Sequence, residues 1–323
     1  MSDLVVIGSC AGKFYVLDRQ TGALHWSYDI QQDGKQISFH GDPLVVDTTV
    51  IIGTDHSCAP DGIGHVYAFD AKNSTVRWKR KFKGIYTPVV LSGKEIIFGS
   101  VADEWYKAEL ATGVPVWRYQ VKMDSPSCGS PRAVVVLEDK VYFVGQDSAI
   151  YVLESASGKL SKRIVPPSPP STALTTYRQQ IVFGAEDGRL YSLDPATTKF
   201  KAILRWEGKP TGKLQLDGDT LYLFIDGPDK QGQLASVDLA TNTLRWTQAA
   251  ERQWASDKPQ LWRGQVLAGN CGGKVSAFAA KDGLELWSTQ FQGCVRSIGL
   301  SNDLLYIGAQ EGMLYAFAPA GTQ

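Results

Sequence analysis

The sequence predicts an all-β protein assembled from repeated small sheets. Thirty-two glycines are spread along the 323 residues, and only 20% of the residues are charged. This composition favours many short strands joined by tight turns over long solvated helices. Hydrophobic residues make up 43% of the chain, which is ample for a buried core at this length.

A repeat of about 40 residues runs through the whole chain. Its first copy contains an apolar run at residues 5–8, a second apolar run that ends at Asp18, a Thr21-Gly22 turn and Trp26. Internal periods of roughly 20 to 50 residues are typical of solenoids, propellers and arrays. The position of Asp18 recurs at spacings of 39 to 52 residues in seven further copies, at Asp70, Glu109, Glu154, Asp194, Asp238, Ala279 and Ala318.

Each full copy carries four short apolar runs separated by Gly, Asp, Asn and Ser turns. In the third copy these runs are residues 88–91, 96–99, 105–108 and 116–119. We name the four expected strands A to D in chain order. A four-stranded unit with this period is typical of a β-propeller blade, whose sheet buries both faces only when neighbouring blades stack on it. The sequence predicts a single β-propeller domain over residues 1–323 with eight four-stranded blades, and seven blades are the alternative.

The two terminal copies are incomplete. No apolar run for strand A precedes residues 5–8, and the chain stops soon after Ala318, before a strand D of the eighth copy. Thirty strands are therefore expected. We expect the first and last blades to pack against each other and close the ring.

An acidic residue and a tryptophan mark most copies, and both are interpreted as structural. The carboxylate at the end of strand C can accept hydrogen bonds from turn amides, and the following glycine can adopt a positive φ. A large ring with one N–H donor is suited to a wedge between blades. The tryptophan follows the acid by eight residues in five copies, at Trp26, Trp78, Trp117, Trp246 and Trp287, and is replaced by Lys162 and Ala202 in the fourth and fifth.

The repeat resembles a known family. Residues 17–26, 110–117 and 238–246 are similar to the tryptophan-docking repeat of alcohol dehydrogenases that depend on pyrroloquinoline quinone (PQQ), and residues 184–194 are similar to the strand B to C unit of that family. The resemblance covers essentially the whole chain and implies a PQQ-type propeller fold. The quinone enzymes are much longer and place adjacent cysteines beside the cofactor, whereas this chain has no adjacent cysteines, so PQQ is not expected. In length the chain is closer to the outer-membrane assembly lipoprotein propeller, which is a non-catalytic scaffold.

Charge and hydropathy narrow the classes of partner and location. The 33 basic and 33 acidic residues cancel, so no broad positive field would attract a nucleic acid. No apolar stretch approaches the roughly 20 residues that a transmembrane helix needs. The N-terminal residues have no basic n-region and no apolar h-region, and five cysteines without a Cys-x-x-Cys pair fit a reducing compartment. We expect a cytoplasmic protein, unless a signal segment has been removed.

The reactive side chains map to one end of the blades, where the D-to-A and B-to-C connections lie. Loops on a rigid scaffold commonly carry function. Thiolates and imidazoles bind soft and borderline metals, and an imidazole can activate a thiol nucleophile. Small cysteines that merely fill tight turns are the alternative. Aligning the strand A starts on Pro43, Pro131 and Ser297 puts His40, Cys128 and Cys294 at one equivalent position, and the B-to-C turns add His56 and Cys58 as metal candidates, with Cys10 and Cys271 as weaker ones.

Five charged residues near these connections are candidates for ligand binding. Arg132, Lys213 and Arg296 lie at or near the starts of their A strands, where three cations could receive an anion. Solvated lining of the channel is the alternative interpretation. Asp42 and Asp55 are the acidic candidates, both in the second copy.

Two functions stay open at this stage. The first is a binding or scaffold propeller whose channel-mouth face engages a protein, peptide or small ligand. The alternative is a metal- or thiol-dependent enzyme that uses the Cys/His cluster on the same face, with a transition metal as its cofactor. The two functions can be distinguished by whether the cysteine side chains lie close together in space, because a metal site needs three or four ligand atoms about 2.0 to 2.3 Å from one ion.

Overall fold

The computed structural model confirms an all-β, eight-bladed propeller. It describes residues 3–9, 11–34, 38–55, 63–122, 134–250, 252–301, 303–309 and 312–318, and of His40 and Lys230 only the backbone. Thirty strands and two 3-10 helices, η1 (Ile30–Asp33) and η2 (Pro228–Lys230), lie in this part of the chain. Six sheets have four strands and two have three. Within the same ranges, no helix has the length and apolar character that crossing a membrane requires.

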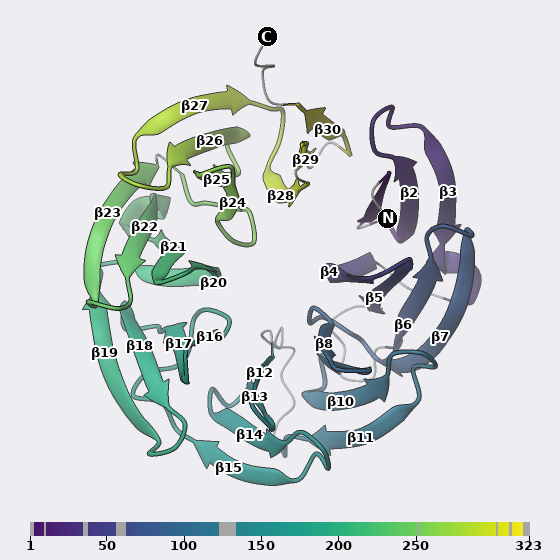
Figure 1. Ribbon diagram of the computed structural model, residues 1–323, viewed down its shortest axis with the longest axis horizontal. Coiled ribbons are helices and arrows are strands. Elements are labelled where there is room, and N and C mark those ends of the chain that lie inside the picture. Colours follow the sequence, from purple (N-terminus) through teal and green to yellow (C-terminus); the bar gives the residue numbers. More distant parts are fainter. Residues whose placement is uncertain are drawn as a thin grey trace. The chain divides into compact units, whose positions relative to one another are not determined.

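Met1–Val165 form a compact unit of four blades, numbered 1 to 4 in chain order (Figure 1). Their strands are β1 (Leu4–Gly8), β2 (Lys13–Asp18) and β3 (Leu24–Asp29) in blade 1; β4 (Ser38–Val46), β5 (Thr49–Asp55), β6 (Ile63–Asp70) and β7 (Thr75–Lys83) in blade 2; β8 (Val90–Ser92), β9 (Glu95–Gly99), β10 (Glu104–Glu109) and β11 (Pro115–Gln120) in blade 3; and β12 (Val135–Leu137), β13 (Lys140–Val144), β14 (Ile150–Glu154) and β15 (Leu160–Ile164) in blade 4.

Pro166–Gln323 form a second compact unit, with blades 5 to 8. Their strands are β16 (Thr175–Tyr177), β17 (Gln180–Gly184), β18 (Arg189–Asp194) and β19 (Lys199–Arg205) in blade 5; β20 (Lys209–Asp217), β21 (Thr220–Asp226), β22 (Gly232–Asp238) and β23 (Thr243–Ala250) in blade 6; β24 (Gln260–Trp262), β25 (Gln265–Gly269), β26 (Lys274–Ala279) and β27 (Glu285–Gln290) in blade 7; and β28 (Val295–Leu300), β29 (Leu305–Ala309) and β30 (Leu314–Phe317) in blade 8.

The expected incompleteness of the terminal blades is confirmed. Blade 1 has the strand order β1-β2-β3 and blade 8 the order β28-β29-β30, so each has three strands, while the six blades between them have four. The packing of these two blades against each other stays a prediction.

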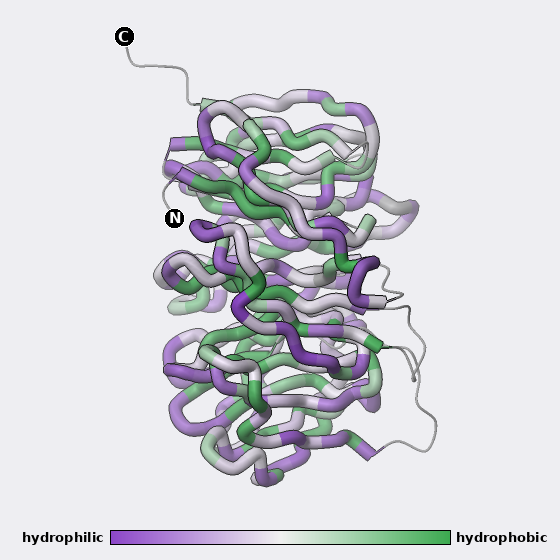
Figure 2. Tube along the Cα trace, turned by 90° about the vertical axis from the view of Figure 1, so that its right-hand side faces the viewer, coloured by the Kyte–Doolittle hydropathy of each residue, from purple (hydrophilic) through white to green (hydrophobic). Residues whose placement is uncertain are grey.

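The hydrophobic core lies between neighbouring blades. Successive residues of a strand point to opposite faces of the sheet, yet Ile51 and Ile52 on β5 are 0% and 1% exposed, so both faces of this strand are covered. Ile51 packs in a cluster with Phe98 of blade 3, and Ile52 packs in another cluster with Phe14 of blade 1. Figure 2 shows the resulting alternation of hydrophobic segments and hydrophilic turns along the trace.

The acidic residue at the end of strand C holds the turn, as predicted. The Asp18 carboxylate accepts hydrogen bonds from the backbone N–H groups of Gln20 (3.0 Å) and Thr21 (2.7 Å), and Gly22 adopts a φ of 71°. Hydrogen bonds from the Thr21 backbone and hydroxyl lower the pKa of Asp18. Asp238 accepts the equivalent bonds from Ala240 and Thr241. The carboxylate therefore accepts hydrogen bonds from N–H groups of the C-to-D turn that have no backbone carbonyl as a partner.

Three of the five predicted tryptophans join neighbouring blades through a hydrogen bond, which confirms the structural interpretation for these three, whereas the Trp287 N–H donates to the Gln265 side chain of its own blade at 2.9 Å. Each of three indole Nε1–H groups donates to the carbonyl of the residue that follows strand C in the next blade: Trp78 to Leu110 (3.1 Å), Trp117 to Ser155 (2.9 Å) and Trp246 to Ala280 (3.1 Å). Each ring also lies on the glycine of that next turn. A Cβ added at Gly113, Gly158 or Gly283 would lie only 2.6 to 2.7 Å from the indole, so the turn needs glycine there for space as well as for φ.

Blade 5 departs from the predicted position of the missing tryptophan. Counting eight residues from Asp194 predicts Ala202, but the register places Lys201 opposite Ser192, where Trp246 lies opposite Ser236 in blade 6. The reason is the β-bulge. Along strand D of blade 6 the bulge comes directly before the tryptophan pair, between Ser236 and Val237. In blade 5 it comes two pairs later, between Leu190 and Tyr191 and after the Lys201 pair.

Replacing Trp117 by alanine should destabilise the protein by about 3 to 5 kcal/mol, because the substitution empties a buried inter-blade site. Trp117 is 7% exposed, whereas the preceding Val116 is 45% exposed. Val116→Ala is thus the matched control and should change the free energy of unfolding by less than about 1 kcal/mol. Urea denaturation measures both, and equal losses would contradict the docking role of Trp117.

The single domain predicted for residues 1–323 has a calorimetric test. Glu154 and Asp194 are separated by 40 residues, an ordinary repeat length, so no linker is inserted between Met1–Val165 and Pro166–Gln323. We expect one cooperative transition in differential scanning calorimetry, with equal calorimetric and van't Hoff enthalpies. Two separated transitions would contradict a single domain.

Candidate functional site

The structure addresses only part of the predicted Cys/His cluster. Cys10, His56, Cys58 and Cys128 lie outside the described residues, and of His40 only the backbone is described. The backbone register separates His40 from Cys294, which the alignment made equivalent. His40 pairs with Gly53 near the end of strand B, whereas the matching Gly308 pairs with Ser297. The irregularity between His40 and Leu44 shifts β4 relative to β28 and causes this difference.

Cys271 and Cys294 form a disulfide that the sequence analysis did not predict. Cys271 lies in the B-to-C turn of blade 7, and Cys294 immediately precedes β28 of blade 8, so the bond links two neighbouring blades. In this oxidised form the two sulfurs are not thiolate metal ligands. The alignment of repeats could not predict this bond, because a B-to-C turn lies next to the start of strand A of the following blade only once the blades are stacked.

The described residues contain no group of three or more His, Cys, Asp or Glu side chains that could hold a metal ion. The predicted ligand-binding residues are distributed differently. Lys213 forms an ion pair with Asp257, and Asp55 is 3% exposed with its carboxylate 3.5 Å from the Ser38 hydroxyl. Asp42 is exposed on β4, and Arg132 lies outside the described residues. Arg296 lines a cavity in the described part of blades 6 to 8.

This cavity has a volume of about 560 Å³ and lies at the D-to-A and B-to-C end of blades 6 to 8. Its walls come from three connections. They are η2 in the B-to-C connection of blade 6, the segment between β23 and β24, and the B-to-C turn of blade 7 next to β28. The lining residues are Asp229, Arg252, Gln253, Trp254, Ala255, Cys271 and Arg296. We call this cavity the arginine pocket.

Backbone hydrogen bonds fix the segment that carries Trp254. The Ala255 and Ser256 N–H groups donate to the Gly269 carbonyl (2.8 and 3.1 Å), and the Gly269 N–H donates to the Ser256 hydroxyl (3.2 Å). Gly269 is required here because an added Cβ would lie 2.7 Å from Val295 of blade 8. The pocket is thus built on a rigid junction between blades.

Trp254 combines a buried ring with an unsatisfied donor. The side chain is 7% exposed and packs against Phe224 and Phe278, at ring-centroid distances of 5.8 and 6.2 Å. Its Nε1–H is buried and has no hydrogen-bond partner among the described residues. Such a donor is costly when unpaired and needs an explanation.

The two arginines of the pocket are free to bind. Arg252 and Arg296 are exposed, and neither has an ion pair or hydrogen bond with a described residue. Asp229 is the single acidic side chain in the lining, so the pocket carries an excess positive charge. Guanidinium groups bind carboxylates with two parallel hydrogen bonds. The pocket therefore suits a carboxylate.

Sequence reasoning missed Arg252 and Trp254. Both lie in the D-to-A connection between β23 and β24, a position that the analysis had already associated with binding. Trp254 follows Trp246 by eight residues and breaks the spacing of the docking tryptophans. That extra tryptophan outside the repeat position was the available signal.

The fold and the repeat define the class as a PQQ-type β-propeller, in which Trp78, Trp117 and Trp246 make the tryptophan-docking contact. The chain belongs to the family described as outer membrane protein assembly factor BamB, whose model matches residues 1–119, 62–209 and 201–323. The predicted resemblance is thereby confirmed. No curated protein matches the chain.

Solved structures share the fold at low sequence identity. BamB from Moraxella catarrhalis has 16% identity and a TM-score of 0.73, with 98% of this chain and 94% of that chain covered. The computationally designed Ika8 protein has 17% identity, a TM-score of 0.78 and the same coverage. Quinohemoprotein alcohol dehydrogenase ADHIIG from Pseudomonas putida HK5 has 12% identity and a TM-score of 0.73, with 96% and 69% covered. At these identities the likeness shows the fold alone.

The disulfide yields a prediction on stability. Cys271 and Cys294 are separated by 23 residues, and closing a loop of this size stabilises a protein by about 3 kcal/mol. Cys294→Ser should lower the free energy of unfolding by about this amount, and adding Cys271→Ser should cause little further loss. The measurement is urea denaturation without reductant. If both cysteines of the denatured, unreduced protein react with iodoacetamide, the disulfide is wrong.

Proposed function

We propose that this chain is a protein-binding scaffold whose arginine pocket receives an acidic side chain of a partner. Membership of the BamB family supports a propeller that binds protein. The observation that carries the finer proposal is that Arg252 and Arg296, neither of them paired with a described residue, line one pocket with Trp254, whose buried N–H has no partner among the described residues. Both guanidinium groups are donors that line the pocket, and the proposal assigns the buried Trp254 N–H as a third donor to the same acceptor.

A carboxylate is the acceptor that suits these donors. It carries the charge that the two arginines favour and has two oxygens, which can accept from a guanidinium and from an indole N–H at once. Because both arginines are exposed, salt screens their contribution. We therefore expect weak binding by one acidic side chain and tighter binding by a partner that presents several.

The test uses two labelled peptides, acetyl-Glu-Gly-Glu-Gly-Glu and acetyl-Gln-Gly-Gln-Gly-Gln, each with the same C-terminal fluorophore. Fluorescence anisotropy should show binding of the Glu peptide that is at least about tenfold tighter than that of the Gln peptide, since a hydrogen bond to a charged group contributes about 1.5 to 3 kcal/mol. Arg252→Glu combined with Arg296→Glu should abolish the difference. Trp254→Phe should weaken the Glu peptide severalfold while preserving the ring.

The control is Lys281→Glu, which changes an exposed charge in the C-to-D turn of blade 7, at the opposite end of that blade's strands. It should leave the affinity unchanged. Equal affinity for the Glu and Gln peptides, or an equal loss in Lys281→Glu, would contradict a specific carboxylate site.

A further inference from the structure

Three filled docking sites define what the tryptophan contact requires. In each, the tryptophan lies on strand D and pairs with the strand C residue two positions before the acid, as Trp78 does with Ala68 and Trp117 with Lys107. Its indole contacts the next blade. The indole N–H donates to the carbonyl that follows strand C of that next blade. The ring lies on the left-handed turn residue three positions later, which is Gly113 for Trp78.

The contact between blades 5 and 6 has the same framework without an indole. Lys201 takes the tryptophan position opposite Ser192. Leu239 follows β22 and provides the carbonyl position, and Asn242, with a φ of 59°, takes the place of the glycine. We call this site the vacant docking slot.

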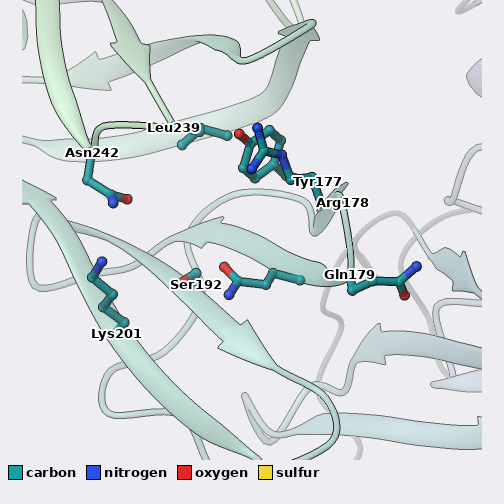
Figure 3. A pocket seen from close by; sticks show the side chains of 8 residues that line it. Tyr177, Arg178, Gln179, Ser192, Lys201, Leu239 and Asn242 are labelled. Carbon is teal, nitrogen blue, oxygen red and sulfur yellow. The ribbon is translucent and has the colours of Figure 1, made fainter.

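The vacant docking slot is a cavity rather than a collapsed interface. Ser192, Lys201, Leu239 and Asn242, the residues of the docking framework, all line a cavity of about 330 Å³ (Figure 3). This volume falls within the range of small-molecule sites, roughly 300 to 1,000 Å³. The remaining lining comes from the A-to-B turn and adjoining strand ends of blade 5, residues 177–180.

One wall of the slot is held in place by Asp219 of blade 6. The Tyr177 hydroxyl donates to the Asp219 carboxylate at 2.7 Å, and the Arg178 guanidinium donates to it at 3.1 Å. Arg178 also stacks over the Tyr177 ring, 5.1 Å from its centroid, and Figure 3 shows the two side chains together at one side of the cavity. These bonds keep the wall from closing the space that the missing indole leaves.

The carbonyl of Leu239, a residue that lines the slot, has no donor among the described residues. The Leu239 N–H donates to the Asp219 carbonyl at 2.9 Å, but no described residue donates to the Leu239 carbonyl. In the filled sites the equivalent carbonyls of Leu110, Ser155 and Ala280 accept the indole N–H. The slot thus lacks both the ring and the donor that the other sites contain.

The chain has no spare tryptophan to fill the slot. All nine tryptophans lie in described residues, and all of them are buried or half-buried where they are. An occupant must therefore come from another molecule. Lys201 and Arg178 at the slot add cations that can contact an aromatic face.

We propose that the vacant docking slot between blades 5 and 6 binds a tryptophan side chain of a partner protein. The partner's indole lies in the cavity beside Asn242 and is displaced from the position that Trp246 takes on Gly283, because the Asn242 Cβ fills that space. Its N–H donates to the Leu239 carbonyl. The slot lies at the A-to-B and C-to-D end of the strands, whereas the arginine pocket lies at the other end. The two sites are thus independent, and failure of one proposal leaves the other intact.

The test titrates the isotope-labelled protein with N-acetyl-tryptophanamide and follows amide chemical shifts. We expect the amide chemical shifts of Leu239 and Asn242 to change on titration, and we expect the changes with N-acetyl-leucinamide to be at least tenfold smaller. The double variant Lys201→Trp/Asn242→Gly fills the slot from within and supplies the glycine that a docked indole needs. It should abolish the shifts at residues 239 and 242 and raise the thermal unfolding midpoint above that of Asn242→Gly alone. Lys199→Trp, two residues earlier on β19 and exposed, is the matched control and should bind the probe as the parent does.

Asn242→Gly gives the slot the turn residue of the filled sites and should retain or strengthen binding. Absence of shifts at Leu239 and Asn242 in the parent protein would overturn the proposal. So would unchanged binding in Lys201→Trp/Asn242→Gly, once circular dichroism shows that this double variant is folded, and so would a loss of binding in Asn242→Gly alone.

Discussion

The fold depends on one constraint, which is that no blade can bury its own sheet. The middle strands carry large apolar side chains on both faces, as Ile96 and Ile97 show with 0% exposure each. A four-stranded sheet alone leaves these faces in water, so each blade is stable only with neighbours. The tryptophan contact strengthens this arrangement, because one side chain supplies both buried area and a hydrogen bond to the next blade.

The same constraint explains where the chain can vary. Strands B and C are covered on both faces, whereas the connections at the two ends of the strands are free to change sequence without cost to the core. The arginine pocket uses one end, where the segment after β23 meets the B-to-C turn of blade 7. The vacant docking slot uses the other end, where blade 5 lacks a tryptophan. In both places the repeat is broken, by an additional Trp254 in one and by Lys201 in the other.

Residues that break a repeat have a clear energetic meaning. Trp254 keeps a buried N–H that has no partner in the described part of the chain, although a phenylalanine would avoid that cost. Lys201 leaves a cavity, although a tryptophan would fill it as Trp246 does in the next blade. Both choices sacrifice stability, and such sacrifices are expected at binding sites. This is the physical ground that the two proposed sites share.

The sequence by itself determined the blade, because a period near 40 residues, four apolar runs and the Asp18-type turn are local features. It also determined the docking role of Trp78, Trp117 and Trp246, because ring and glycine recur at fixed spacing. It could not determine the register of blade 5, since the position of a β-bulge depends on strand pairing rather than on residue count. Tertiary structure likewise decided the Cys271–Cys294 bond and the pocket that Arg252 and Arg296 share. The reason is that stacking brings together connections of different blades that are far apart in the chain.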